Sequence, residues 1–175
     1  MTYHLKQWLG CLKHYALMCL FISSPDKLPN SVHCILLSLL GYLLLNLSLV
    51  DIYSSLANIV TALTMELMLL AIITYAGLWW RKTLPRFNQT ISALVGVNLV
   101  ISLISFPLYH SVAQETARGT ELTQAVINAS LAILIWNLAV LSLIFKRAFE
   151  LSTMLSAMIS FCYFVFLQFM VAKLR

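Results

Sequence analysis

Apolar residues along this chain form long runs separated by short polar segments. The runs cover about 31–50, 56–80, 89–110, 122–146 and 150–172. Each is close to the ~20 residues that an α-helix needs to cross the hydrocarbon core of a bilayer. The pattern therefore predicts an all-α, polytopic membrane bundle of about five transmembrane helices with short connections.

A different pattern precedes the first run. Residues 3–22 have helical periodicity with a basic side and an apolar side. The basic side holds Lys6, Gly10, Lys13, His14 and Leu17, and the other side holds Trp8, Leu9, Leu12, Tyr15, Ala16 and Cys19. This pattern is typical of an amphipathic helix that lies in the membrane interface. Pro25 and Pro29 then end the helix. We expect one membrane domain over 1–175, with the interfacial helix and linker over 1–30 and the bundle over 31–175.

Composition excludes a water-soluble domain. Hydrophobic residues make up 61% of the chain and charged residues 10%, against roughly 45–50% and 25% in soluble domains. The net charge of +5 comes from cations at the ends of the apolar runs. No basic patch alternates with stacking aromatics, so we expect the lipid bilayer as a partner and no nucleic acid.

The positions of the cations predict the orientation. They fall in three sets, which are Lys6, Lys13 and Lys27; Arg81, Lys82 and Arg86; and Lys146 and Arg147. With about five spans, all three sets lie on one side, and the positive-inside rule makes that side cytoplasmic. Lys173 and Arg175 oppose this assignment. The expected interface anchors are Trp8, Lys6, Lys13, Trp79, Trp80, Arg81 and Lys82, because aromatic rings and cations favour the headgroup level.

Glu66 is an acid inside the second apolar run. It lies about 20 Å along a helix from Trp79, at 1.5 Å per residue, which is beyond the middle of a ~30 Å core. An ionised carboxylate there costs about 2.5 kcal/mol or more. We expect Glu66 to point into the bundle, to be mostly neutral at pH 7, and to bond to an amide or hydroxyl of another span. The structural interpretation is favoured because one acid forms no relay, but a proton or substrate site stays open.

Other polar and small residues in the runs predict helix contacts. Asn98, Asn137 and Gln168 are candidate partners of Glu66, as are Asn58 and Thr64. Such amides join helices in lipid with about 0.6 kcal/mol each on average. The small residues Ser92 and Gly96 in the third run, and Ser152, Ser156 and Ser160 in the fifth, are expected to let helix backbones approach closely.

No pattern in the chain predicts catalysis. His14, His33, Cys11 and Cys34 match no metal-binding spacing, and no CxxC pair is present. The serines have no base and no GxSxG motif around them. We therefore expect no cofactor, no metal and no catalytic residue.

One segment resembles a known group of proteins. RFNQTISALVGVNLVISLISFPL (86–108), together with SPDKLPNS (24–31), is similar to small, uncharacterised proteobacterial inner-membrane proteins whose layout is like that of Yip1-type five-span domains. The resemblance implies a five-helix bundle in the bacterial inner membrane and no reaction.

These observations give two expectations for function. The first is a non-catalytic accessory, scaffolding or assembly component that binds other integral membrane proteins or self-associates. The alternative is a small transporter or lipid-handling protein that uses the intramembrane carboxyl of Glu66.

Overall fold

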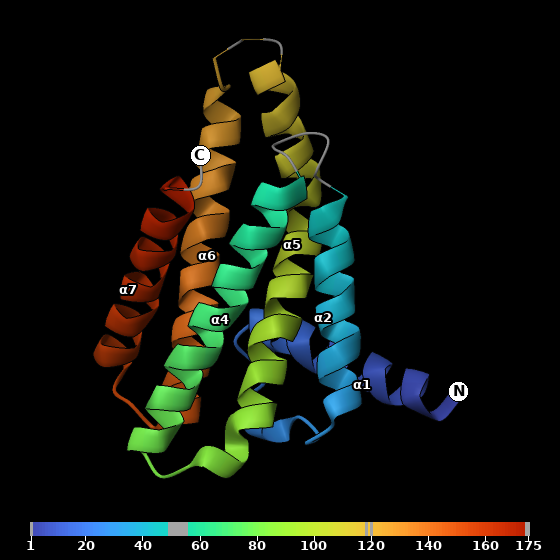
Figure 1. Cartoon of the computed structure of the whole chain (residues 1–175), viewed down its shortest axis with the longest axis vertical. Coiled ribbons are helices and arrows are strands. Elements are labelled where there is room, and N and C mark those ends of the chain that lie inside the picture. Colours follow the sequence, from blue (N-terminus) through green and yellow to red (C-terminus); the bar gives the residue numbers. More distant parts are fainter. Residues whose placement is uncertain (1, 49–55, 118, 120, 174–175) are drawn as a thin grey trace.

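The computed structural model describes residues 2–48, 56–117, 119 and 121–173, and it confirms the all-α bundle. The described helices are α1 (Thr2–Cys19), α2 (Val32–Leu47), α4 (Leu56–Trp80), α5 (Phe87–Ala117), α6 (Gln124–Phe149) and α7 (Thr153–Ala172), with the 3₁₀ turns η1 (Pro25–Lys27) and η2 (Leu84–Arg86). No strand occurs in the described residues. The long helices run side by side (Figure 1).

Four of the helices are long and apolar enough to cross a membrane. These four are α4, α5, α6 and α7. α2 is equally apolar but has 16 residues, or about 24 Å of helix, which is short of a ~30 Å core. The last residues of the predicted first span, 49 and 50, lie outside the described part. A complete crossing by α2 therefore stays a prediction.

α5 is the central helix of the bundle. It contacts α1, α2, α4 and α6. In the most apolar 18-residue segment of α5, 56% of the residues are buried inside the protein, against 11–17% in the corresponding segments of α4, α6 and α7. The predicted third span ended near residue 110, but α5 continues through Pro107 to Ala117. Near the end of α5, the Glu115 carboxylate accepts hydrogen bonds from Thr123 N and Oγ1 just before α6.

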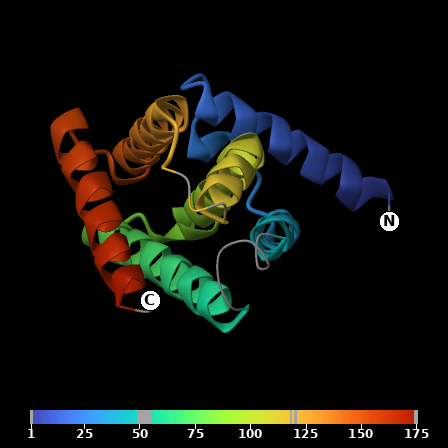
Figure 2. The same cartoon turned by 90° about the horizontal axis from the view of Figure 1, so that it is seen from above.

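α1 lies across the long helices rather than along them (Figures 1 and 2). It packs against α5 and α2, and Cys11, Tyr15 and Met18 are fully buried in that contact. On the predicted apolar side, Tyr15 and Cys19 are buried, whereas Leu9 is 54% exposed on the outer surface. The buried face of α1 is set by its contacts with α5 and α2. A location at the membrane interface stays a prediction.

α6 and α7 form a tight antiparallel hairpin (Figure 1). Glu150 ends α6 in the left-handed conformation, with φ 54° and ψ 45°. Ser152 then begins α7, and its Oγ accepts from Leu155 N. The polar turn therefore holds two apolar helices against each other.

The end of the bundle at this hairpin gathers the basic segments. Glu150 contacts Arg86 at 3.3 Å and Arg81 at 3.8 Å. Arg147 donates to Ser23 O, which lies next to η1. The Asp26 carboxyl has a lowered pKa at this end, chiefly because it is hydrogen-bonded to the Ser24 side chain. The cationic segments before α2, after α4 and after α6 thus share one end of the molecule.

The half of the bundle near this basic end is tightly packed. Leu78, Leu94, Ile144, Phe145 and Phe149 are fully buried there. The rings of Phe145 and Phe149 stack with centroids 5.3 Å apart. We call this region the packed half.

Candidate functional site

A polar cavity lies beyond the packed half, from the middle of the bundle toward the end away from the basic segments. Its volume is about 410 Å³, and α2, α4, α5, α6 and α7 all contribute side chains to it. The polar lining residues are Tyr42, Asn46, Glu66, Asn98, Ser102, Ser105, Tyr109, Ser130, Asn137, Tyr163 and Gln168. Side chains of this kind cost free energy in lipid, so their gathering around one space marks it as the candidate site.

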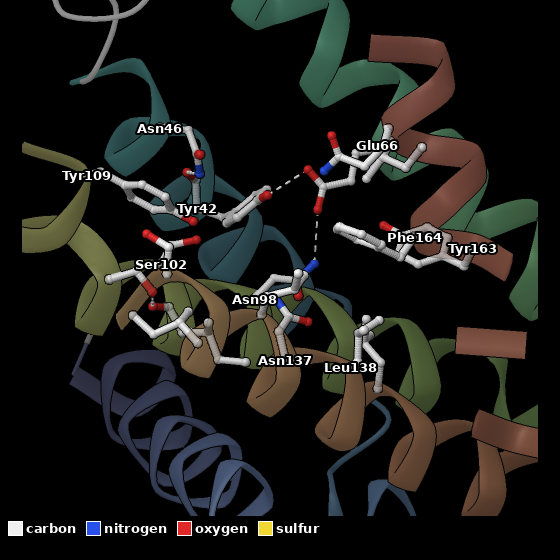
Figure 3. A pocket seen from close by; sticks show the side chains of 18 of the residues that line it. Tyr42, Asn46, Glu66, Asn98, Ser102, Tyr109, Asn137, Leu138, Tyr163 and Phe164 are labelled. Carbon is white, nitrogen blue, oxygen red and sulfur yellow. Dashed lines mark hydrogen bonds between the residues drawn. The ribbon is translucent and has the colours of Figure 1, made fainter. Parts of the chain in front are cut away.

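Glu66 is held in place by two neighbouring helices. Tyr42 Oη donates a hydrogen bond to Glu66 Oε2 at 2.8 Å, and Asn98 Nδ2 donates to Glu66 Oε1 at 3.2 Å. Figure 3 shows the three side chains turned toward one another from α2, α4 and α5. Both bonds run from a donor to a carboxyl oxygen, so Glu66 acts as the shared acceptor at the junction of three helices.

The four intramembrane polar residues singled out in the sequence line this one cavity. These are Glu66, Asn98, Asn137 and Gln168. Asn98 is also the amide that bonds to Glu66. The hydroxyl of Thr64 instead bonds to Val60 O of its own helix. The structure thus confirms Asn98 as a partner of Glu66 and places Asn137 and Gln168 around the same space.

Sequence reasoning missed the tyrosines and serines of the cavity. Asn98, Ser102, Ser105 and Tyr109 recur at intervals of four, three and four residues, so they form one polar stripe on α5. Tyr42 and Asn46 repeat that spacing on α2. This periodicity of polar residues within apolar runs was the available signal.

Four of the five predicted small residues, all but Ser152, are buried or touch a neighbouring helix. Tyr15 Oη is 2.7 Å from Ser92 Oγ, and the Tyr15 ring lies against the backbone of Gly96. Ser156 and Ser160 are buried on α7, and Ser156 Oγ is 3.2 Å from Ser142 Oγ of α6. The prediction for Ser152 was wrong, because this residue is exposed and caps the N-terminus of α7 instead of packing between helices.

The predicted interface anchors have different surroundings. Trp79 and Trp80 are exposed at the basic end, next to Arg81 and Lys82. Lys13 of α1 is also exposed. Trp8 is partly buried, whereas the side chain of Lys6 lies outside the described part. Contact of these residues with headgroups stays a prediction.

Three of the cysteines are buried as small apolar residues. Cys11 Sγ of α1 lies 2.7 Å from Cys34 Sγ of α2, and both thiols are free. Burial raises the pKa of the Cys11 thiol to about 12, with a further contribution from Cys34. Burial raises the pKa of Cys19 to about 11. The thiols of Cys11 and Cys19 are therefore poor nucleophiles.

Comparison of the chain with protein-family models, with curated proteins and with solved structures finds no match. The resemblance to five-span inner-membrane proteins stays a prediction.

Proposed function

We propose that this chain is a small multi-pass membrane protein that takes a polar solute into the cavity around Glu66, as a transporter or a solute-binding protein. The supporting observation is the pairing of a partly buried carboxyl with a cavity of about 410 Å³. That volume lies within the ~300–1,000 Å³ of small-molecule sites. An intramembrane acid beside a polar cavity is also the usual mark of a substrate or ion pathway.

The location of the cavity indicates the direction of access. Its lining residues on α2, α4 and α7 lie in the half of the helix away from the basic end, and those on α5 and α6 begin near the middle of the helix. With the basic end in the cytoplasm, as the cations predict, the cavity lies between the middle and the outer face of a bacterial inner membrane. Solute would then enter from the non-cytoplasmic side.

The accessory role is the competing proposal. It was favoured by the sequence because neither a soluble domain nor a catalytic constellation is visible there, whereas the polar cavity favours solute binding. Purification in mild detergent followed by mass spectrometry separates the two. A reproducible, stoichiometric membrane partner would favour the accessory role, whereas a monomer or a homodimer would favour solute binding.

A matched pair of α5 variants tests the proposal directly. Ser102 lines the cavity, while its neighbour Leu103 is 62% exposed on the outer surface. Ser102→Trp fills the cavity, and Leu103→Trp adds the same ring outside it. We expect at least one member of a polar solute library to raise the melting temperature of the wild type and Leu103→Trp but not of Ser102→Trp, since ligands stabilise only proteins that bind them. No such solute across the library would refute the proposal.

A further inference from the structure

The unpartnered polar atoms of the cavity are hydrogen-bond acceptors. Asn98 Oδ1 and Asn137 Oδ1 are buried and have no hydrogen-bond partner within the described residues. The Asn98 side chain itself is 6% exposed. Its amide orientation follows from its neighbour, because Nδ2 donates to Glu66 Oε1 and leaves Oδ1 as the free acceptor. Buried acceptors without a donor are uncommon in proteins.

Glu66 adds further acceptor capacity. An ionised carboxylate offers about four lone-pair positions, and Tyr42 and Asn98 occupy one on each oxygen. Glu66, Asn98 and Asn137 therefore present several acceptors to one space. A ligand that fits this arrangement supplies donors.

The charge of the lining also favours a ligand that supplies donors, because it is negative. Among the lining residues that the structure describes, Glu66 is the one acidic side chain, and none is Lys, Arg or His. An anionic ligand would meet an acid without a counter-charge. A cation would neutralise Glu66 and offset the cost of burying its charge.

Aromatic rings complete the lining. Tyr42, Tyr109, Tyr163 and Phe164 all border the cavity, and Figure 3 shows Tyr163 and Phe164 on the side of the space near Glu66. The faces of such rings attract organic ammonium groups. A volume of about 410 Å³ would hold on the order of a dozen waters at ~30 Å³ each, which is far more space than a bare monovalent ion fills.

We infer that the solute is a small organic ammonium compound, with its charged nitrogen between Glu66, Asn98 and Asn137 and its carbon skeleton among the tyrosines. This inference rests on the proposed function. It assigns the ligand by the donors, charge and ring contacts that the cavity requires.

The test compares three probes of one shape. Phenethylammonium, 2-phenylethanol and phenylacetate differ mainly in their charged or neutral head group, and a panel from methylammonium to spermidine covers other sizes. Binding is followed as the rise in melting temperature of the purified full chain in detergent. We expect one or more ammonium compounds to stabilise the wild type in a saturable way, and the neutral and anionic probes to have no effect at the same concentration.

Variants on one helix locate the binding site. Asn137→Leu removes a cavity acceptor, whereas Asn128→Leu on the same helix changes an exposed amide outside the cavity. We expect Asn137→Leu and Glu66→Gln to weaken ammonium binding at least tenfold and Asn128→Leu to leave it unchanged. If Asn137→Leu does not fold, Asn137→Ser also removes the amide oxygen from the cavity, and its hydroxyl keeps the side chain polar.

The outcomes separate the two proposals. Stabilisation by 2-phenylethanol or phenylacetate that Ser102→Trp abolishes would overturn the ammonium assignment and leave solute binding intact. Saturable stabilisation by sodium chloride alone, lost in Glu66→Gln, would overturn it in favour of an inorganic cation. A response of Ser102→Trp equal to that of the wild type for every compound would overturn both.

Discussion

The ring of Tyr15 lies directly against the backbone of Gly96. A Cβ atom built at Gly96 would come within 2.4 Å of Tyr15 Cε2, closer than real side chains approach. Tyr15 Oη also contacts Ser92 Oγ at 2.7 Å and accepts from Ser38 Oγ at 3.3 Å. One aromatic side chain of the crosswise helix α1 therefore joins α5 and α2.

Gly96→Ala should loosen the contact between α1 and α5. The added methyl group forces the Tyr15 ring to move, and overpacking of this kind typically costs about 1–3 kcal/mol. Thermal unfolding in detergent should show the loss. Gly10→Ala is the matched control, because nothing lies within 4 Å of the Cβ that it adds. Equal stability of the two variants would contradict the packing described for α1.

Glu66 variants should separate hydrogen bonding from ionisation. Glu66→Gln keeps an acceptor for Tyr42, so stability should stay near wild type. Glu66→Leu leaves the Tyr42 hydroxyl and an Asn98 donor unpaired, and we expect a loss of about 1–3 kcal/mol. Unfolding of both variants provides the measurement. A double-mutant cycle with Tyr42→Phe should show coupling for Glu66→Leu, and additive effects would mean that the bond contributes nothing.

Glu150→Gly should be close to neutral or slightly stabilising. Glu150 adopts a left-handed conformation, φ 54°, which costs a non-glycine residue about 1–2 kcal/mol. Its ion pairs with Arg81 and Arg86 are exposed, and such pairs contribute about 0–1 kcal/mol. Glu150→Ala loses the ion pairs and keeps the strain, so it should be the less stable of the two. The reverse order in unfolding experiments would show that the ion pairs dominate.

Cys11 should react slowly with maleimide while the protein is folded. Its pKa is raised from 9.0 to about 12, which lowers the thiolate fraction near pH 7 roughly a thousandfold, and thiolate is the reactive form. Mass spectrometry before and after denaturation should show modification of Cys11 and Cys19 in the unfolded chain alone. Lys13→Cys, at an exposed position of α1, should react in the folded protein and serves as the positive control.

Reporter fusions test the orientation. A fusion after residue 84 should be cytoplasmic and one after residue 117 external, because the segments with Arg81, Arg86 and Arg147 share one end and cations favour the cytoplasmic side. The opposite pattern would place the cavity on the cytoplasmic side. A cytoplasmic reporter at the C-terminus would instead contradict the count of about five spans.

The helices were predictable because twenty-residue apolar runs have few alternatives in a membrane protein. The order and type of α4 to α7 follow from that pattern alone. The buried face of α1 was not predictable, since it depends on which residues of α5 meet it. Tyr15 was expected on an apolar side, but nothing in the sequence indicates that Gly96 leaves room for its ring.

The residues of the candidate site were partly predictable from the sequence, but their arrangement around one cavity was not. Glu66, Asn98, Asn137 and Gln168 are conspicuous as polar residues in apolar runs. Their meeting at one space depends on the rotation of each helix about its axis, which packing decides. Tyr42 was missed because a tyrosine within an apolar run is easily taken for an apolar residue.

The packed half closes the cavity on the side of the basic end. The stacked rings of Phe145 and Phe149 and the side chains of Leu78 and Leu94 fill the space between the cavity and the basic end. A molecule that enters beside Glu66 leaves by the route through which it came, unless these packed side chains move apart. Transport across the membrane would therefore require the α6–α7 hairpin to shift its aromatic residues. Capture and release on a single side would require no rearrangement of the packed half at all.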